Sequence, residues 1–231
     1  MTSRELQNAA ALAAGEWVAA APRELPRGPN ALSREVVLMS QRGRLLEGVV
    51  DAVAELGYFA TTVQEITRRA RVSRTTFYEQ FANKEECFLV AYAAGTWAHL
   101  EQMREAVRRT DGWLAQLSEG VRAYVELLAA RPAYARTFLL EVHKAGELAL
   151  ERRRAIHGRY ADLLREWHGR RPAGAGEPVS DEFFIGAVGA INEVVVERLH
   201  EAGVAGLPEL SPTITRMLLA LFGIDQAGLA R

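Results

Sequence analysis

TTVQEITRRARVSRTTFYEQFANKEEC, the stretch at residues 61–87, predicts two short helices that meet at a tight turn. Its apolar residues recur at helical intervals with one interruption, so two helices can bury a shared face. Thr62 and Glu65 have the spacing of a capping box that starts the first helix at Val63, and Ser73 is expected to cap the second. The reversal between them takes about three residues, which is the spacing of a helix-turn-helix unit.

The same stretch is locally basic. Four arginines and no acidic residue lie between Ile66 and Tyr78, namely Arg68, Arg69, Arg71 and Arg74. Such a run suits the DNA backbone, but a solvated helix pair with scattered basic residues would carry the same charges. A further helix is expected from Asn83, and Lys84 then lies in its first turn, where a cation opposes the helix dipole. A phosphate partner would account for that position.

Residues 44–92 resemble the DNA-binding domain of the TetR family of one-component transcriptional regulators. The shared elements are Gly57-Tyr58, Thr62-Val63, Val72-Ser73, Thr76-Phe77-Tyr78, Phe81 and Lys84-Glu85-Glu86. The resemblance implies phosphate contacts at Thr62, Tyr78 and Lys84. It implies base-edge contacts from the second, recognition helix at Arg74, Thr75 and Thr76.

Two positions depart from the family, which usually has alanine where Thr67 stands and glycine where Arg71 stands. Arg71 is therefore expected at an unusual φ, and the two helices are expected to pack slightly less closely. An earlier helix completes a three-helix core over residues 33–82, with an apolar stripe of Leu46, Val49, Val50, Val53 and Leu56.

Residues 1–32 form an extension ahead of this domain. Asn8 and Glu16 interrupt its alanine-rich beginning, and a basic start is missing, which argues against a secretion signal. The proline-, glycine- and arginine-rich segment that follows suits an arm lying along DNA, with Arg23 and Arg27 in an adjacent minor groove. A linker without fixed structure would have the same composition.

Composition limits the class of protein. The formal net charge of −1 over 231 residues means that basic character must be local. The single Cys87 excludes an intramolecular disulfide and a cysteine-based zinc site, and the histidines lack close ligand spacing, so no metal or cofactor is expected. No apolar run reaches about 18 residues, so we expect no membrane span and a cytoplasmic protein.

Residues 83–231 are expected to form a helical regulatory and dimerisation domain. Turn signals separate helices at 83–109, 112–130, 132–143, 146–169, 181–202 and 211–222, and no strand pattern competes. The whole chain is therefore predicted to be all-α.

The last two helices are candidates for a homodimer interface. Small and apolar residues that would let a second copy approach are Gly186, Gly189, Ala190, Met217 and Leu221, with Ile185, Val188, Val195, Leu199, Ile214, Leu218 and Phe222 around them. Two helices from each subunit would form a four-helix interface with twofold symmetry. A monomer that uses these helices to close its own core is the alternative.

Four residues on apolar helical segments are candidates for a ligand pocket: Tyr124, Phe138, Tyr160 and Asn192. Asn192 is the most suggestive because a buried amide needs hydrogen-bond partners, although each of the four alone is also compatible with a plain core.

These features favour a DNA-binding transcriptional regulator, a repressor that binds a palindromic operator as a homodimer and is released by an unknown small-molecule effector. An enzyme is not favoured, because the sequence has no nucleophile motif, glycine-rich phosphate loop or paired-carboxylate constellation. An architectural DNA-binding protein without an effector stays open as an alternative.

Overall fold

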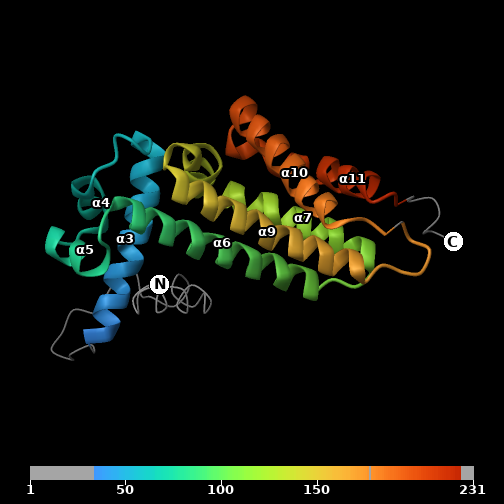
Figure 1. The fold of residues 1–231 in the computed structure, drawn as a ribbon, viewed down its shortest axis with the longest axis horizontal. Helices are drawn as coiled ribbons and strands as arrows, with labels where there is room; N and C mark the ends of the chain where they lie inside the picture. Colours follow the sequence, from blue (N-terminus) through green and yellow to red (C-terminus); the bar gives the residue numbers. More distant parts are fainter. Residues whose placement is uncertain (1–33, 177, 225–231) are drawn as a thin grey trace. The chain divides into compact units, whose positions relative to one another are not determined.

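The computed structural model describes residues 34–176 and 178–224 (Figure 1). Within those ranges all regular structure is helical, with nine α-helices, α3 to α11, and no strand. The predicted all-α fold is therefore confirmed. No helix in the described ranges is long and apolar enough to cross a membrane.

The helices belong to two compact units. The first unit holds the described residues up to Ala98 together with Arg136–Arg152, and the second holds His99–Ala135 and the described residues from Arg153 onward. Helices α6 (Lys84–Arg108) and α9 (Glu147–Gly169) each begin in the first unit and end in the second. The division of function after residue 82 stays a prediction, because compactness does not report which residues bind DNA or a ligand.

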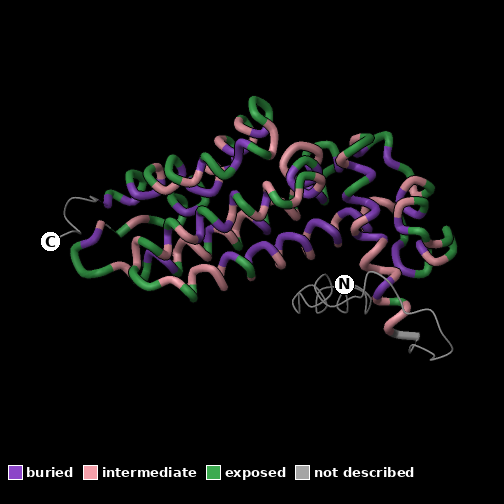
Figure 2. The backbone as a smooth tube through the Cα atoms, turned by 180° about the vertical axis from the view of Figure 1, so that it is seen from behind, coloured by how far each residue is buried: buried purple, intermediate pink, exposed green. Residues whose placement is uncertain are grey.

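Three helices form the helix-turn-helix part of the first unit. They are α3 (Arg34–Leu56), α4 (Val63–Ala70) and α5 (Arg74–Gln80). Figure 2 shows buried positions alternating with intermediate and exposed ones along them, as the amphipathic pattern predicts. Leu56 is an exception to the predicted stripe, because it is 39% exposed at the last position of α3. Gly57 follows it at φ 79° and turns the chain out of the helix.

Helices α3 and α4 approach each other closely at Gly48. A Cβ atom at this position would lie 2.8 Å from the backbone oxygen of Ile66. Thr67 fits into the buried side of α4 because its hydroxyl donates a hydrogen bond to Gln64 O within the same helix. The importance of Gly48 was not predicted from the sequence.

The predicted helix at 132–143 is wrong in detail, because the segment is not one α-helix. A short helix α8 (Pro132–Ala135) is followed by a π-helical turn η1 (Arg136–Glu141) and a 3-10 turn η2 (Val142–Lys144). The buried hydroxyl of Thr137 donates to Val50 O at 2.9 Å, which attaches η1 to α3. This attachment joins residues far apart in the sequence, so no local pattern reports it.

The other predicted helices agree with the structure to within one residue at either end. In the second unit they are α7 (Trp113–Ala130), α10 (Asp181–Ala202) and α11 (Ser211–Leu221), with 3-10 turns η3 (Val204–Gly206) and η4 (Pro208–Leu210) before α11. Helix α7 packs against α11, whose buried side chains include Ile214 and Leu218.

Two tryptophans join the start of α7 to the end of α9. The indole rings of Trp113 and Trp167 stack with centroids 4.3 Å apart and an interplanar angle of 5°. Each indole N–H also donates to the backbone oxygen of the other residue, both at 2.9 Å. This tryptophan pair satisfies two polar groups and buries two aromatic faces in one contact.

Candidate nucleic-acid interface

Both predicted helix caps of the helix-turn-helix unit are confirmed. Thr62 Oγ1 accepts the backbone N–H of Glu65 at 3.2 Å, so α4 begins at Val63. Ser73 Oγ accepts the backbone N–H of Thr76 at 3.0 Å and starts α5. Each cap satisfies a backbone donor that has no partner within the helix, which fixes where the two helices start.

The turn between α4 and α5 has the unusual backbone that the sequence predicts. Arg71 lies in the left-handed region with φ 53° and ψ 47°. Its N–H donates to Arg68 O at 3.4 Å, and Val72 N–H donates to Thr67 O at 3.1 Å. Arg44 of α3 adds a hydrogen bond from Nη1 to Arg71 O at 3.4 Å. These contacts reverse the chain within the predicted length.

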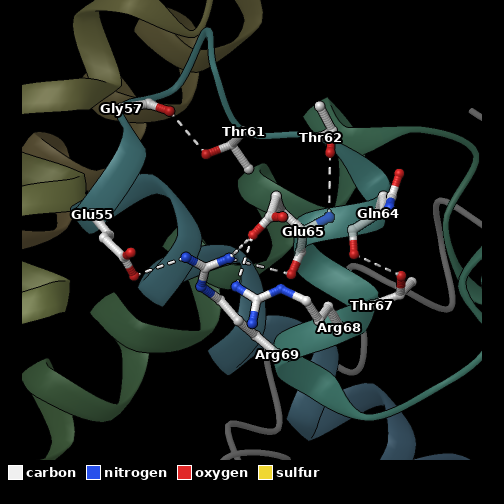
Figure 3. Close-up of polar contacts among 9 residues, drawn as sticks. All are labelled: Glu55, Gly57, Thr61, Thr62, Gln64, Glu65, Thr67, Arg68 and Arg69. Atoms are coloured by element: carbon white, nitrogen blue, oxygen red, sulfur yellow. Dashed lines mark hydrogen bonds and ion pairs between the residues drawn. The ribbon is translucent and has the colours of Figure 1, made fainter.

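Two arginines of the basic run form ion pairs within the protein. Figure 3 shows Arg69 between Glu55 and Glu65, with 2.8 Å from Nη2 to Glu55 Oε2 and a closer contact to Glu65. Arg68 lies 2.9 Å from the same Glu65 carboxylate. Hydrogen bonds from Arg68 and Arg69 lower the pKa of Glu65 below its usual value. Of the four arginines in the run, Arg68 and Arg69 thus pair with carboxylates, and only Arg69 is largely covered, with 11% of its side chain exposed.

The recognition helix α5 has one buried and one exposed face. Phe77 is fully buried, and its ring lies edge-on to the ring of Tyr78, with centroids 5.4 Å apart. Arg74 and Thr75 are exposed, Tyr78 is 49% exposed and Thr76 is half-buried. The predicted base-reading residues therefore lie where a ligand as large as DNA can reach them, and their individual roles stay predictions.

Lys84 has a local role that the sequence did not indicate. Its ammonium group donates to Tyr58 O at 2.8 Å and to Thr61 O at 2.9 Å, and lies 4.3 Å from the centroid of the Tyr58 ring. Burial lowers the pKa of this amine. The argument that a phosphate alone explains Lys84 is therefore corrected, because the lysine binds backbone carbonyls ahead of α4. Its predicted phosphate contact stays a prediction.

Sequence reasoning missed a carboxylate that holds the loop after α3. Glu141 of η1 accepts the backbone N–H of Tyr58 at 2.9 Å and pairs with Lys144 at 2.6 Å. Burial opposes ionisation of Glu141, but the hydrogen bonds from Lys144 and Tyr58, together with the charges of Lys144 and Arg136, outweigh it and lower its pKa. Residues 58 and 141 are distant in the sequence, so no motif could have joined them.

The predicted pocket residues do not form one group. Tyr124 and Tyr160 both contact His99 of α6, an unpredicted buried residue, whose ring stacks on Tyr124 with centroids 5.3 Å apart. His99 Nε2 donates to Tyr124 O at 3.1 Å, which leaves Nδ1 to accept the Tyr160 hydroxyl at 3.2 Å. Burial lowers the pKa of His99 to about 4, so its ring is neutral near pH 7.

Phe138 lies in the first unit, where it stacks on Tyr92 with centroids 4.6 Å apart. Asn192 is buried in α10 of the second unit, as predicted. The assignment of the four residues to a ligand pocket stays a prediction.

The proposed dimer residues remain accessible on one chain. Gly186 and Leu221 are exposed, whereas Gly189, Ala190 and Met217 are half-buried. Their expected apolar neighbours differ in exposure. Ile185 is 48% exposed, whereas the others are buried within the chain itself: Val188, Val195, Leu199, Ile214, Leu218 and Phe222. A partner could therefore contact the exposed and half-buried residues, but not the side chains that are buried within the chain.

The predicted arm residues Arg23 and Arg27 lie outside the described residues. In the part of the chain that the structure describes, no three histidine, cysteine, aspartate or glutamate side chains gather as metal ligands would. Cys87 is buried in this part of the chain, and burial raises the pKa of its thiol.

A known protein family matches the helix-turn-helix part of the chain in sequence. Residues 45–91 match the family described as bacterial regulatory proteins, tetR family. The HTH-type transcriptional activator FasR of Mycolicibacterium smegmatis is 27% identical over 103 residues, which span 45% of this chain and 47% of FasR. The matched part is thus about half of that relative.

Solved structures share the fold over most of the chain. The fatty acid degradation regulator FadR from Bacillus halodurans has a TM-score of 0.68 at 19% identity, covering 84% of this chain and 97% of its own. FadR from Bacillus subtilis, solved in complex with stearoyl-CoA, has a TM-score of 0.63 at 19% identity, covering 79% and 98%. At these identities the likeness establishes the fold alone.

Proposed function

We infer that this chain, which belongs to the TetR family of bacterial transcriptional regulators, represses genes by binding a palindromic operator in double-stranded DNA as a homodimer. As a family member it is a DNA-binding regulator and not an enzyme. We further propose that it acts in the cytoplasm and that a small molecule bound by the second unit releases the DNA.

The observation that carries this proposal is the α4–α5 unit. Its helices begin at side-chain caps, Thr62 and Ser73, and its buried face fixes α5 against α3. The exposed face of α5 presents Arg74 and Thr75, which can donate or accept hydrogen bonds in a major groove, and Tyr78, whose hydroxyl can donate to a phosphate. A rigid helix that exposes such residues is suited to sequence-specific reading.

A homodimer would explain how one short helix gives specificity. Two recognition helices spaced by one DNA turn, about 34 Å, read two half-sites of a palindrome. The exposed apolar and small residues of α10 and α11, among them Ile185, Gly186 and Leu221, supply a surface for a second copy. The same surface used twice gives the twofold symmetry that a palindrome requires.

We propose a long-chain acyl-CoA as the first effector class to test. The support is the stearoyl-CoA complex of the Bacillus subtilis FadR, which shares the fold. An effector shifts the DNA-binding equilibrium only through its differential affinity for two states, and a change from 1:99 to 99:1 requires about 5.5 kcal/mol. We propose α6 as the element that transmits the change, because it begins at Lys84 and continues to His99 in the second unit.

The decisive experiment selects bound sequences from random duplex DNA with the purified full chain and then titrates the best sequence at several salt concentrations. A palindrome with half-sites one turn apart would support the proposal. Weak binding that is independent of sequence would contradict it and favour an architectural protein.

Two further measurements test effector and direction. Stearoyl-CoA added to the complex should release the operator, and free coenzyme A is the matched control. A promoter-reporter assay should show higher expression without the protein, whereas lower expression would assign it the activation that the name of its mycobacterial relative states.

A further inference from the structure

The turn before the recognition helix carries an arginine in a backbone conformation that favours glycine. Arg71, at φ 53°, is the one residue other than glycine with a positive φ within residues 34–176 and 178–224. A Cβ atom makes this conformation costly, and arginine lacks the short polar side chain that lets asparagine or aspartate adopt it. Strain that persists at one position often marks a functional site.

The arginines of α4 form ion pairs with carboxylates, whereas the two arginines that follow this helix do not. Arg68 and Arg69 both pair with Glu65, and Arg69 pairs also with Glu55. Arg71 and Arg74 are exposed, and no carboxylate in the described part of the chain lies within ion-pair distance of either guanidinium group. The uncompensated positive charge is therefore concentrated at the turn and at the first residue of α5.

The backbone of Arg71 is held in place independently of its side chain. Its N–H donates to Arg68 O, and its carbonyl accepts Nη1 of Arg44 at 3.4 Å. The contact from Arg44 brings a second cationic side chain to the same turn. The exposed guanidinium group of Arg71, which has no carboxylate partner in the described part of the chain, can form charge-assisted hydrogen bonds with an anion.

We propose that Arg71 binds a DNA phosphate next to each half-site, and that this contact explains why the turn carries arginine instead of glycine. The inference rests on the proposed DNA-binding function and adds a residue to it. The partner is the sugar-phosphate backbone and not a base edge, because Arg71 lies two residues ahead of the Ser73 cap and outside α5. The contact adds affinity without sequence preference.

The test variant is Arg71→Gly, which removes both the guanidinium and the strain. Binding to the selected operator should weaken on the order of tenfold at 0.1 M salt, and the slope of log K against log salt should fall by about 0.9 per subunit. The thermal midpoint of the full chain should stay unchanged or rise by up to about 4 °C, because relieved strain offsets the greater freedom of glycine when unfolded. Weaker binding without a lower thermal midpoint would show that the variant has lost a DNA contact and not its fold.

Two further variants serve as comparisons. Arg71→Asn tolerates the left-handed backbone without a charge and should lose the same affinity as the glycine variant. Arg68→Ala removes an equal charge from an exposed arginine that pairs with Glu65, and should weaken binding less than about twofold.

Unchanged affinity in both Arg71 variants would overturn the inference while leaving the proposed function intact. An equal loss in Arg68→Ala would also overturn it, because overall charge would then suffice as the explanation. If the unaltered protein selects no DNA sequence, the proposed function fails, and this inference fails with it.

Discussion

At the scale of single residues, Gly48 sets how closely α3 and α4 can approach. The position that a Cβ atom would take is 2.8 Å from Ile66 O, a backbone atom that cannot move without shifting α4. Helix α4 in turn determines where the Arg71 turn and α5 lie. One absent methyl group therefore supports the geometry of the whole recognition unit.

Gly48→Ala should lower the free energy of unfolding by about 1–3 kcal/mol, because the added methyl group overpacks the contact between α3 and α4. Gly158→Ala is the matched control: it lies within α9, and a Cβ there would meet nothing within 4 Å. That variant should gain about 0.5–1 kcal/mol from helix propensity. Urea titration of both variants and of the unaltered protein measures the free energies of unfolding. If Gly48→Ala were as stable as the unaltered protein, α3 and α4 could move apart without a loss of stability.

His99 should make stability depend on pH. The unfolded chain protonates this imidazole near pH 6.5, but burial lowers the pKa in the folded protein to about 4. The unfolded state therefore binds more protons between these values, and stability falls as the pH drops from about 6.5 toward 4, by a total on the order of 3 kcal/mol.

The measurement is the thermal midpoint of the protein and of His99→Gln between about pH 7 and pH 5. Glutamine does not titrate, so the midpoint of the variant should decrease less over this range. Identical pH profiles would show that another group is responsible.

At the scale of elements, the recognition unit was predictable because its signals are local. Caps such as Thr62 and Ser73 lie three residues from the groups they bind. The positive φ of Arg71 was predicted in a different way, from the glycine that the TetR family usually has at this position. The role of Lys84 was misjudged because its carbonyl partners belong to Tyr58 and Thr61, in a loop whose path no helical period describes. Local chemistry can be read from spacing, and distant contacts cannot.

The π-helical turn η1 shows the same limit. A helix was expected at this segment, but Thr137 and Glu141 bind backbone groups of α3 and of the loop after it. Likewise, Tyr124 and Tyr160 both contact His99, a residue of another helix that has no motif around it. The conformation of η1 and the contacts of His99 therefore depend on tertiary contacts, which a local sequence pattern does not report.

Thr137→Val should cost about 0.5–1.5 kcal/mol, because it keeps the shape of the side chain but removes the buried hydrogen bond that joins η1 to Val50 O. Thr213→Val on the exposed side of α11 is the control and should stay within about 0.5 kcal/mol of the unaltered protein. Chemical denaturation of both variants provides the comparison. A neutral Thr137→Val would mean that η1 is held by apolar contacts alone.

At the scale of the whole molecule, the proposed function depends on assembly. The exposed residues of α10 offer room for another helix, since a Cβ at Gly186 or Gly189 would meet nothing within 4 Å. The buried residues of the same helix pack into the core of the chain itself. The inner face of α10 therefore stabilises the subunit, and its outer face is available for a partner. A change on the outer face can therefore disturb assembly without unfolding the subunit.

Gly186→Arg should convert the proposed dimer into a monomer and reduce operator affinity by at least about tenfold, because one subunit reads only one half-site. Sedimentation measures the mass, and DNA titration measures the affinity. Gly158→Arg adds the same charge at another open position, on α9, and should change neither. A dimer that survives Gly186→Arg would place the interface elsewhere.

The tryptophan pair gives the second unit an optical label of its own. Two indoles stacked 4.3 Å apart have coupled electronic transitions, so their emission and circular dichroism differ from those of separated rings. Because both residues belong to the second unit, loss of the coupled signal reports when that unit opens. The far-ultraviolet circular dichroism reports separately when helix is lost over the whole chain. The order of events in unfolding, and after an effector is added, can be followed without attaching any dye.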